Sequence, residues 1–386
     1  MKVLILSCST GGGHNACAKY ILDELKLNNI DCEFKDFYDI VNKKMKNFSE
    51  KLYLSTLNGN GKIFKTVYKL GELYSKTKLK SPVYIVNKLH KKKLYNYIVN
   101  NNIDLVITTH IFPAFTLTSI KKIPFILVAT DYTACPFMEE AKPNYYIIQN
   151  GIEKDFIDKG VDNEKLIKTG IPISTNFIKS SKNIKYNLNI NNEKTILIML
   201  GSMGFGNVTN IINDLLKIEN TKIIIVTGSN KELFNELKKI DNKNLIVLGF
   251  CHNINDLIYS ADIVISKPGG LSSTEIASIN KPLIHAFAIP GIETINTNFF
   301  YNHKMSLKCE NEKDIVTNAI KLLNDDKLQK EMIENQKKII NKNSANDLVN
   351  LVISLDKQKN IKKWYFFNYL LNIVPMKYLL DINHIL

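Results

Sequence analysis

The chain has 386 residues, of which 45% are hydrophobic and 23% are charged, a composition typical of a folded protein of about two domains. Its net charge of +14 comes from lysine alone, since no arginine occurs, so any phosphate would be bound by backbone amides, hydroxyls or lysine. Six scattered cysteines form no Cys-x-x-Cys pair, which argues against a disulfide framework or zinc site and favours a reducing, cytoplasmic compartment. With no signal peptide and no apolar run of ~18–20 residues, we expect a protein that does not cross a membrane.

Predicted strands alternate with helices along the N-terminal half. Apolar runs predict strands at 2–8, 31–37, 104–109, 125–130, 145–148 and 166–169, and a helix at 15–27. This alternation is typical of a doubly wound parallel sheet. We therefore predict an N-terminal Rossmann-like domain over residues 1–178.

A lysine-rich stretch interrupts this half at residues 60–100. It holds ten lysines and one acid, Glu72, interleaved with apolar residues at helical spacing. A basic face beside exposed apolar side chains suits an anionic membrane surface, although a solvated face over an ordinary core is an alternative. No nucleic-acid recognition motif accompanies the lysines, so we expect no nucleic-acid partner.

The strand–helix pattern restarts after a polar segment at 179–194, which we interpret as a linker. Strands are predicted at 195–200, 222–227, 245–248, 263–266 and 283–286, and helices at 207–218 and 310–355. We predict a C-terminal domain over 195–355 and an aromatic helical tail over 356–386, which packs on the N-terminal domain or contacts a membrane. Two such Rossmann-like domains of the α/β class would face each other across a ligand-binding cleft.

Three glycines and a histidine follow the first predicted strand. Gly12 and Gly13 would let a substrate approach bare backbone at a helix start, and His14 could accept a proton near neutral pH. Asp131, at the end of another strand, could orient His14 or act as a base, whereas the alternative is a turn or helix cap. His110 is a weaker candidate.

Two glycine-rich turns in the second half predict a nucleotide diphosphate site. Gly201, Ser202 and Gly204 follow one strand, and Gly269 and Gly270 follow another and open a helix. Backbone N–H groups at such a turn, with the positive end of the helix dipole, bind phosphate. No Gly-Lys-Ser/Thr follows, which disfavours a Walker loop.

Ser272 and Glu275 begin the helix after the second of these turns. The Glu275 carboxylate could accept hydrogen bonds from a ribose diol. The alternative is a capping box, in which Glu275 bonds to the backbone at the start of its own helix.

A further motif, Pro290-Gly291 with Glu293 and Asn296, could direct a carboxylate and an amide at sugar hydroxyls. No Asp-x-Asp triplet occurs, so we expect no metal and no cofactor beside the donor substrate. Stabilisation of a leaving group would then fall to helix dipoles and backbone amides.

Together these residues resemble the monogalactosyldiacylglycerol synthase and processive diacylglycerol glucosyltransferase family, related to the peptidoglycan lipid-linked N-acetylglucosaminyl transferase. The resemblance covers roughly residues 1–350. It implies a GT-B fold, a UDP-sugar donor, inversion at the anomeric carbon and a membrane lipid acceptor. It is carried by Thr10–His14, Thr130–Tyr132, Gly170–Pro172, Gly201–Gly204, Lys267–Gly270 with Glu275, and Pro290–Gly291 with Glu293 and Asn296.

Two positions depart from the family pattern. Ile292 stands where the family usually has a glutamine that helps to recognise the donor sugar, and an isoleucine cannot donate those hydrogen bonds. Cys135 lies in the segment where the family usually has a histidine after its Thr-Asp pair.

From these motifs we predict an inverting hexosyltransferase, cytoplasmic and peripheral on the inner face of the membrane, that moves a hexose from a UDP-sugar to a lipid such as diacylglycerol. His14, supported by Asp131, would remove the proton from the acceptor hydroxyl. The alternatives are a UDP-sugar 2-epimerase of similar fold and a catalytically silent nucleotide-sugar-binding protein.

Overall fold

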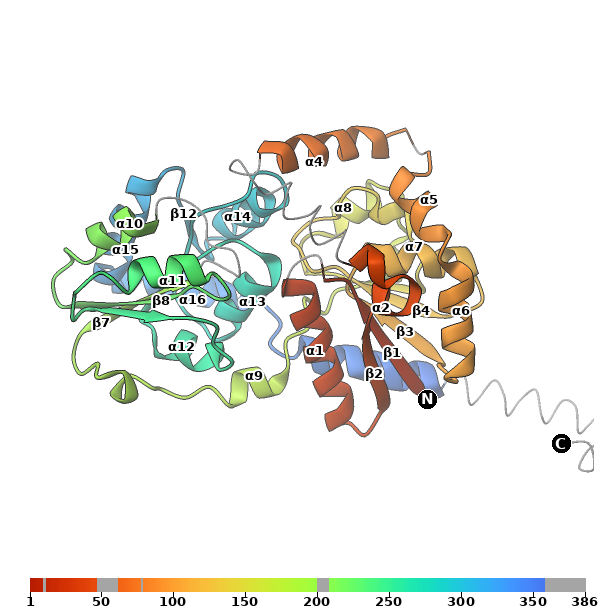
Figure 1. The fold of residues 1–386 in the computed structure, drawn as a ribbon, viewed down its shortest axis with the longest axis horizontal. Helices are drawn as coiled ribbons and strands as arrows, with labels where there is room; N and C mark the ends of the chain where they lie inside the picture. Colours follow the sequence, from red (N-terminus) through yellow and green to blue (C-terminus); the bar gives the residue numbers. More distant parts are fainter. Residues whose placement is uncertain (10–11, 47–61, 78, 200–207, 358–386) are drawn as a thin grey trace, which may run out of the picture.

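Two parallel six-stranded sheets, each flanked by helices, form the framework of the protein (Figure 1). The computed structural model describes residues 1–386 except 10–11, 47–61, 78, 200–207 and 358–386. We call the part that carries the first sheet the first lobe, and the part that carries the second sheet the second lobe. The α/β fold predicted from the alternating pattern is confirmed.

The first sheet has the strand order β2-β1-β3-β4-β5-β6, and its central strands are aliphatic runs buried on both faces. Its elements are β1 Lys2–Ser7, α1 Gly12–Leu27, β2 Asp31–Asp36, α2 Phe37–Val41, α4 Lys62–Ser75, α5 Pro82–Lys88, α6 Lys91–Asn100, β3 Leu105–Thr108, α7 Ile111–Ile120, β4 Phe125–Val128, η1 Met138–Glu140, β5 Tyr145–Ile147, α8 Glu153–Ile157, η2 Asn163–Lys165 and β6 Leu166–Ile167.

The second sheet has the strand order β12-β11-β10-β7-β8-β9. Its elements, with those that lead into it, are α9 Thr175–Lys179, η3 Tyr186–Leu188, β7 Lys194–Met199, α10 Val208–Leu215, β8 Thr221–Val226, α11 Lys231–Leu237, β9 Leu245–Leu248, α12 Ile254–Ser260, β10 Ile263–Ser266, α13 Gly270–Ser278, β11 Leu283–His285, α14 Ile292–Asn302, β12 Leu307–Lys308, α15 Glu312–Asn324 and α16 Asp326–Ile339. A last helix occupies 344–357.

Each sheet reverses its strand order at one point, and ligands of such folds bind in the crevice beyond that point. In the first sheet the reversal lies between β1 and β3, where Val3 pairs with Leu105. In the second it lies between β7 and β10, where Ile198 pairs with Ile265. The turn after β1 leads to His14, and the turn after β10 holds Gly269 and Gly270, so the predicted motifs lie at both points.

Every strand predicted from an apolar run is present, whereas the two-residue β12 was missed. The lysine-rich region 60–100 is not one helix but three, α4, α5 and α6. No helix in the described part of the chain is long and apolar enough to span a membrane.

The crossing from the first lobe to the second lies at the start of the predicted linker. Thr175 still hydrogen-bonds to Glu24 of α1, with 3.1 Å between the Thr175 nitrogen and Glu24 Oε2. Lys182 and Ile184 already donate their backbone N–H groups to Asp256 and Ser260 of α12. Most of residues 179–194 therefore packs on the second lobe.

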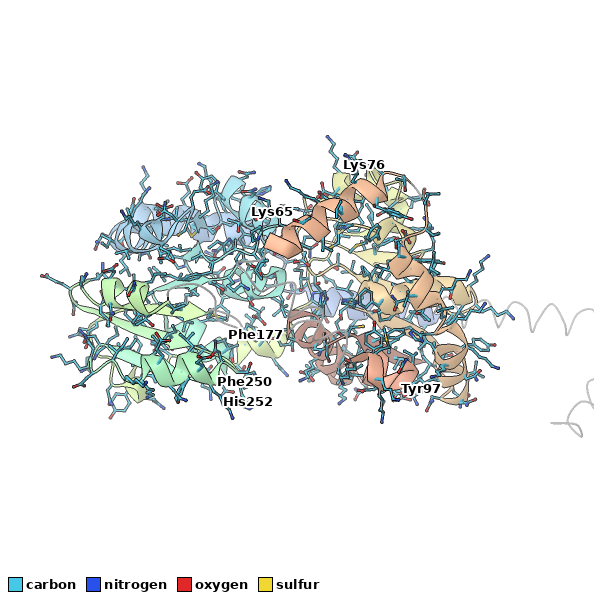
Figure 2. The ribbon with its side chains drawn as sticks, turned by 45° about the horizontal axis from the view of Figure 1, so that its top comes forward. Lys65, Lys76, Tyr97, Phe177, Phe250 and His252 are labelled. Carbon is cyan, nitrogen blue, oxygen red and sulfur yellow. The ribbon has the colours of Figure 1, made fainter. Side chains whose placement is uncertain are left out.

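Helix α4 packs on the loop that follows β4. Its Gly71 lies so close that an added Cβ would be 3.3 Å from the Pro136 Cβ, and its Ser75 hydroxyl donates to Glu139. In Figures 1 and 2, α4 lies on the outside of the molecule, with Lys65 toward the junction of the lobes and Lys76 farther from it.

The lobes meet where α13 and α14 of the second contact the loop after β4 of the first. The Asn296 side chain accepts from the Tyr132 nitrogen at 2.8 Å and donates to Asp131 and to the Pro268 carbonyl, each at 2.9 Å. The Tyr132 hydroxyl lies 2.6 Å from the Thr274 hydroxyl. A buried amide with all these bonds fixes the two lobes relative to each other.

Gly270 is required at this junction because the backbones approach so closely. A Cβ placed on it would lie 2.0 Å from the Thr130 carbonyl oxygen, whereas a Cβ on the neighbouring Gly269 meets nothing within 4 Å. Backbone atoms cannot move aside as a flexible side chain does.

We expect Gly270→Ala to lower the free energy of unfolding by ~1–3 kcal/mol, the usual cost of overpacking. The matched variant Gly269→Ala should cost less than ~1 kcal/mol, since space is open there. Urea unfolding of both variants measures this difference. Equal stability of the two variants would contradict the close approach of the lobes.

Candidate active site

His14 lies in the first turn of α1, at the junction of the lobes, and is half-buried. Its Nδ1 lies 2.7 Å from the Thr109 carbonyl oxygen and 3.1 Å from the Thr130 hydroxyl. A carbonyl oxygen can only accept, so Nδ1 carries the proton of the neutral ring. The lone pair is therefore on Nε2, the arrangement that a general base needs.

Burial lowers the pKa of His14, while the charge of Asp131 and the hydrogen bond to Thr109 act in the opposite direction. Because the net change is downward from 6.5, the ring is neutral at neutral pH. The ring of His110 stands edge-on to it, with 4.8 Å between the centroids.

His110, the weaker candidate, has a structural role. Its Nδ1 accepts from the Phe112 nitrogen at 3.2 Å and so caps the start of α7. Burial and the nearby His14 place its pKa well below the usual range. The structure thus favours His14 over His110 as a base.

Asp131 acts on His14 through its charge rather than by orienting the ring. The bonds that orient His14 come from Thr109 and Thr130, whereas Asp131 Oδ1 accepts from Asn296. The predicted support of His14 by Asp131 is therefore electrostatic, since a nearby negative charge raises the pKa of the imidazole.

Open space surrounds the glycines that were predicted to admit a substrate. A Cβ on Gly12 would meet nothing within 4 Å, as on Gly269, and one on Gly13 would lie 3.9 Å from Leu271 of α13. Gly270 instead lies against the first lobe. Thus the two glycine turns face each other across the junction.

Glu275 points from α13 to the first lobe and forms no capping box. The N-cap of α13 is Gly269, which has no side-chain cap, and Ser272 is half-buried beside it. The Glu275 Oε1 accepts from the Tyr20 hydroxyl of α1 at 2.7 Å. Burial raises the pKa of Glu275 to about 7, opposed by the hydrogen bond from Tyr20.

The motif at Pro290 is built differently from the prediction. Gly291 needs its glycine because its φ is 119°. The half-buried Pro290 precedes it. Glu293 accepts from the Ile289 nitrogen at 2.7 Å and pairs with Lys267, with 3.3 Å between the charged atoms. This ion pair opposes the effect of burial, which raises the pKa of Glu293.

Asn296 does not point at a sugar site in this structure, because both ends of its amide bond within the protein. It is fully buried, with 0% of its surface exposed. The expectation that it reads sugar hydroxyls is corrected to a role in joining the lobes. Such cross-lobe bonds have no signature in a single sequence.

Several predicted residues cannot be placed. Gly201, Ser202 and Gly204, together with Thr10 and Gly11, lie outside the described residues. Within the described residues, no group of three or more His, Cys, Asp or Glu side chains could hold a metal ion.

Four residues of this site were given no role by the sequence analysis, although Thr130 and Lys267 lie in motifs that carry the resemblance: Tyr20, Thr109, Thr130 and Lys267. Thr109, Thr130 and Lys267 each follow a strand that ends at the junction, and that position was an available signal. Tyr20 lies six residues after His14 on α1, and nothing local marks it.

Family models match both halves of the chain. Residues 14–173 match the model described as Monogalactosyldiacylglycerol (MGDG) synthase, and residues 195–352 match the Glycosyltransferase family 28 C-terminal domain.

Curated relatives extend the similarity to nearly the whole chain. A processive diacylglycerol beta-glucosyltransferase of Bacillus pumilus is 27% identical over 366 residues, covering 91% of this chain and 94% of the relative. The protein of that name from Bacillus subtilis is 26% identical over 376 residues, covering 94% and 97%.

Solved structures with the same fold are more distant in sequence. MurG of Acinetobacter baumannii has a TM-score of 0.62 at 15% identity, covering 92% of this chain and all of that one. The UDP-GlcNAc 2-epimerase of Neisseria meningitidis has a TM-score of 0.58 at 15% identity, with the same coverage. By sequence, the first lobe is thus similar to the monogalactosyldiacylglycerol synthase family, and the second to the glycosyltransferase family 28 C-terminal domain.

Proposed function

We propose that this protein is an inverting glycosyltransferase that moves a hexose from a UDP-sugar to a membrane lipid such as diacylglycerol. One observation carries the proposal: relatives named processive diacylglycerol beta-glucosyltransferase match over more than 90% of both chains. The arrangement of His14 opposite α13 supplies the chemistry that such a reaction needs.

The donor would bind at the second lobe, with its ribose at Glu275 and its diphosphate at the start of α13. Free space beside Gly269 admits a phosphate to the positive end of the helix. Gly201, Ser202 and Gly204 remain predicted phosphate contacts. This arrangement uses no metal and no cofactor beyond the donor.

In the proposed reaction, Nε2 of His14 takes the proton from the acceptor hydroxyl. The resulting oxygen forms a bond to the anomeric carbon while the bond from that carbon to the UDP oxygen breaks, so UDP leaves with the electron pair. Attack opposite the leaving group inverts the anomeric configuration. The helix dipole of α13 would stabilise the charge on UDP.

The lipid acceptor would be reached from the surface formed by α4, α5 and α6. Four leucines there expose between 61% and 77% of their surface: Leu70, Leu73, Leu79 and Leu89. Exposed lysines lie among them, and Figure 2 shows Lys65 on α4 and Lys76 just after its end. Apolar side chains beside cations suit the interface of an anionic bilayer.

The two alternatives from the sequence find less support. Epimerase structures share the fold at 10–15% identity, which says nothing about the reaction. An epimerase or a silent nucleotide-sugar-binding protein has no use for the exposed apolar and cationic side chains of α4–α6.

We expect His14→Ala to reduce glycolipid formation by about 10²–10⁴-fold, the typical contribution of a general base. UDP affinity, measured by calorimetry, should stay within a factor of about three. The acid limb of kcat/KM should lie below pH 6.5, because burial lowers the pKa of His14. Asp131→Asn should move this limb to still lower pH, since Asp131 raises that pKa. Wild-type turnover in His14→Ala would remove the base from the mechanism.

We expect Glu275→Gln to weaken UDP binding by about 10–100-fold, since charge-assisted hydrogen bonds contribute about 1.5–3 kcal/mol. The same variant should gain stability at high pH. The folded protein holds a proton on Glu275 up to pH about 7, the unfolded chain only to about 4.5, so wild-type stability falls as pH rises between these values.

The gain of Glu275→Gln in the free energy of unfolding should be about 3 kcal/mol at pH 8 and should vanish below pH about 4.5. Urea unfolding at several pH values measures it, with Glu232→Gln, an exposed carboxyl on α11, as the control. If the difference in the free energy of unfolding between wild type and Glu275→Gln did not change with pH, Glu275 would not be buried at the junction.

We expect a triple variant of Lys88, Lys91 and Lys92 to glutamine to bind phosphatidylglycerol vesicles about 100-fold more weakly, at about 1 kcal/mol per lysine. These exposed lysines lie on α5 and at the start of α6. The control replaces Lys231, Lys239 and Lys243 of the second lobe. Co-sedimentation with the vesicles measures the binding of both triple variants. An equal loss of binding in both would show that the vesicles attract the protein through its overall charge and not through this surface.

A further inference from the structure

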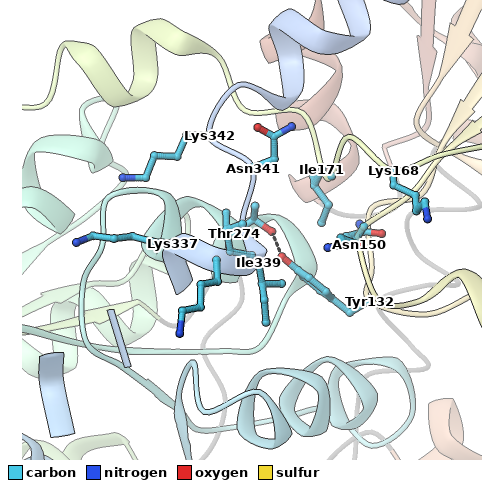
Figure 3. A pocket seen from close by; sticks show the side chains of 13 residues that line it. Tyr132, Asn150, Lys168, Ile171, Thr274, Lys337, Ile339, Asn341 and Lys342 are labelled. Carbon is cyan, nitrogen blue, oxygen red and sulfur yellow. Dashed lines mark hydrogen bonds between the residues drawn. The ribbon is translucent and has the colours of Figure 1, made fainter. Parts of the chain in front are cut away.

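A cavity of about 520 Å³ lies behind α13, at the hinge between the lobes (Figure 3). The first lobe lines it with Tyr132, Gln149 and Lys168, and the second with Thr274 and the end of α16. Its size is that of a small-molecule site. Among the described residues, none of those proposed to bind the donor or act as base lines it.

The chain crosses between the lobes twice beside this cavity, and the two crossings are bonded together. Asn341 donates its side-chain amide to the Thr169 carbonyl at 2.9 Å. Ser344 donates its hydroxyl to the Ile171 carbonyl at 2.8 Å. An occupant would therefore contact both lobes where they are joined.

The lining is strongly cationic. Lys168, Lys337, Lys338 and Lys342 line the cavity, and no Asp or Glu of the described part of the chain does. Lys168 and Lys337 pair with Glu153 and Glu334, which lie outside the lining. The pKa of Lys342 is lowered by burial and by the charge of Lys337. These neighbouring positive charges favour an anion in the cavity.

One of the lining residues, Gln149, carries a buried hydrogen-bond acceptor without a partner. Gln149 is only 3% exposed, and its Nε2 donates to the Ala129 carbonyl at 3.0 Å. Its Oε1 is buried and accepts no hydrogen bond. A ligand hydroxyl that reached this oxygen would supply the missing hydrogen bond.

We propose that this hinge cavity binds a small phosphate ester that carries hydroxyl groups. The lysines hold the phosphate and Gln149 Oε1 accepts from a hydroxyl. The site differs from the proposed donor site, because Thr274 lines the cavity whereas the next residue, Glu275, contacts Tyr20 of α1.

Calorimetry on the full chain tests the site, with and without saturating UDP so that failure of the donor site is recognised separately. Glycerol 3-phosphate should bind at least tenfold more tightly than inorganic phosphate. The double variant Lys338→Gln/Lys342→Gln should weaken glycerol 3-phosphate at least tenfold, whereas Lys239→Gln/Lys243→Gln, two exposed lysines elsewhere, should not. Absence of binding by both glycerol 3-phosphate and short-chain phosphatidylglycerol, or equal binding by both double variants, overturns the proposal.

A second variant tests the hydroxyl contact. Gln149→Met should bring the affinity for glycerol 3-phosphate down to that for inorganic phosphate and leave the latter unchanged. Short-chain phosphatidylglycerol forms a further arm: binding of this lipid alone, abolished by Lys338→Gln/Lys342→Gln, identifies a lipid headgroup as the source of the phosphate ester. If a folded Gln149→Met variant still prefers glycerol 3-phosphate over inorganic phosphate, the proposed role of Gln149 is contradicted.

Discussion

The contact between the start of α13 and the loop after β4 is the constraint on which the site depends. Asn296 bonds to the backbone on both sides of the junction, and the Gly270 backbone comes against the Thr130 carbonyl. The same Thr130 contacts His14 through its hydroxyl. The position of the proposed base in one lobe is thereby tied to the proposed donor-binding helix of the other, as catalysis between two separately folded lobes requires.

Glu275 shows why this junction is not built for maximum stability. Its carboxyl is buried against the Tyr20 hydroxyl, and burial raises its pKa to about 7. A lysine in place of Tyr20 would neutralise the charge and stabilise the contact between the lobes, but it would also satisfy the carboxylate before a ribose could bind in the proposed donor site. The neutral Tyr20 hydroxyl satisfies the Glu275 carboxylate only in part. Hydroxyls of a ligand therefore gain more by bonding to this carboxylate.

Local patterns in the sequence were sufficient for the framework. Aliphatic runs such as 263–266 are short, flanked by glycine or proline, and alternate with helices, which gives the strands and the doubly wound sheets. The same reasoning located the glycine turns and His14, because motifs at the carboxyl ends of parallel strands gather at one edge of a sheet.

Contacts across the lobes were beyond that reasoning. Asn296 was expected to face a sugar and instead bonds to Asp131 and Tyr132, which lie 164 or more residues earlier. Asp131 was expected to orient His14 or act as a base, and in the structure it acts on His14 through its charge. A side chain's partner depends on how two independently wound sheets dock, and hydrophobic periodicity contains no information about that docking.

Adjacent residues of helix α13 lie at two different sites, and this arrangement would couple the proposed donor site to the hinge cavity. Glu275 contacts α1 on the side of the proposed donor site, while Thr274 bonds to Tyr132 and lines the hinge cavity. A helix packed on both sides moves as one body, so a displacement that separates Thr274 from Tyr132 also moves Glu275 relative to Tyr20. A ligand that bridges the lobes at the hinge would favour one setting of α13, and the donor would favour one as well. Thermodynamic linkage then requires that each ligand changes the affinity of the other by the same factor.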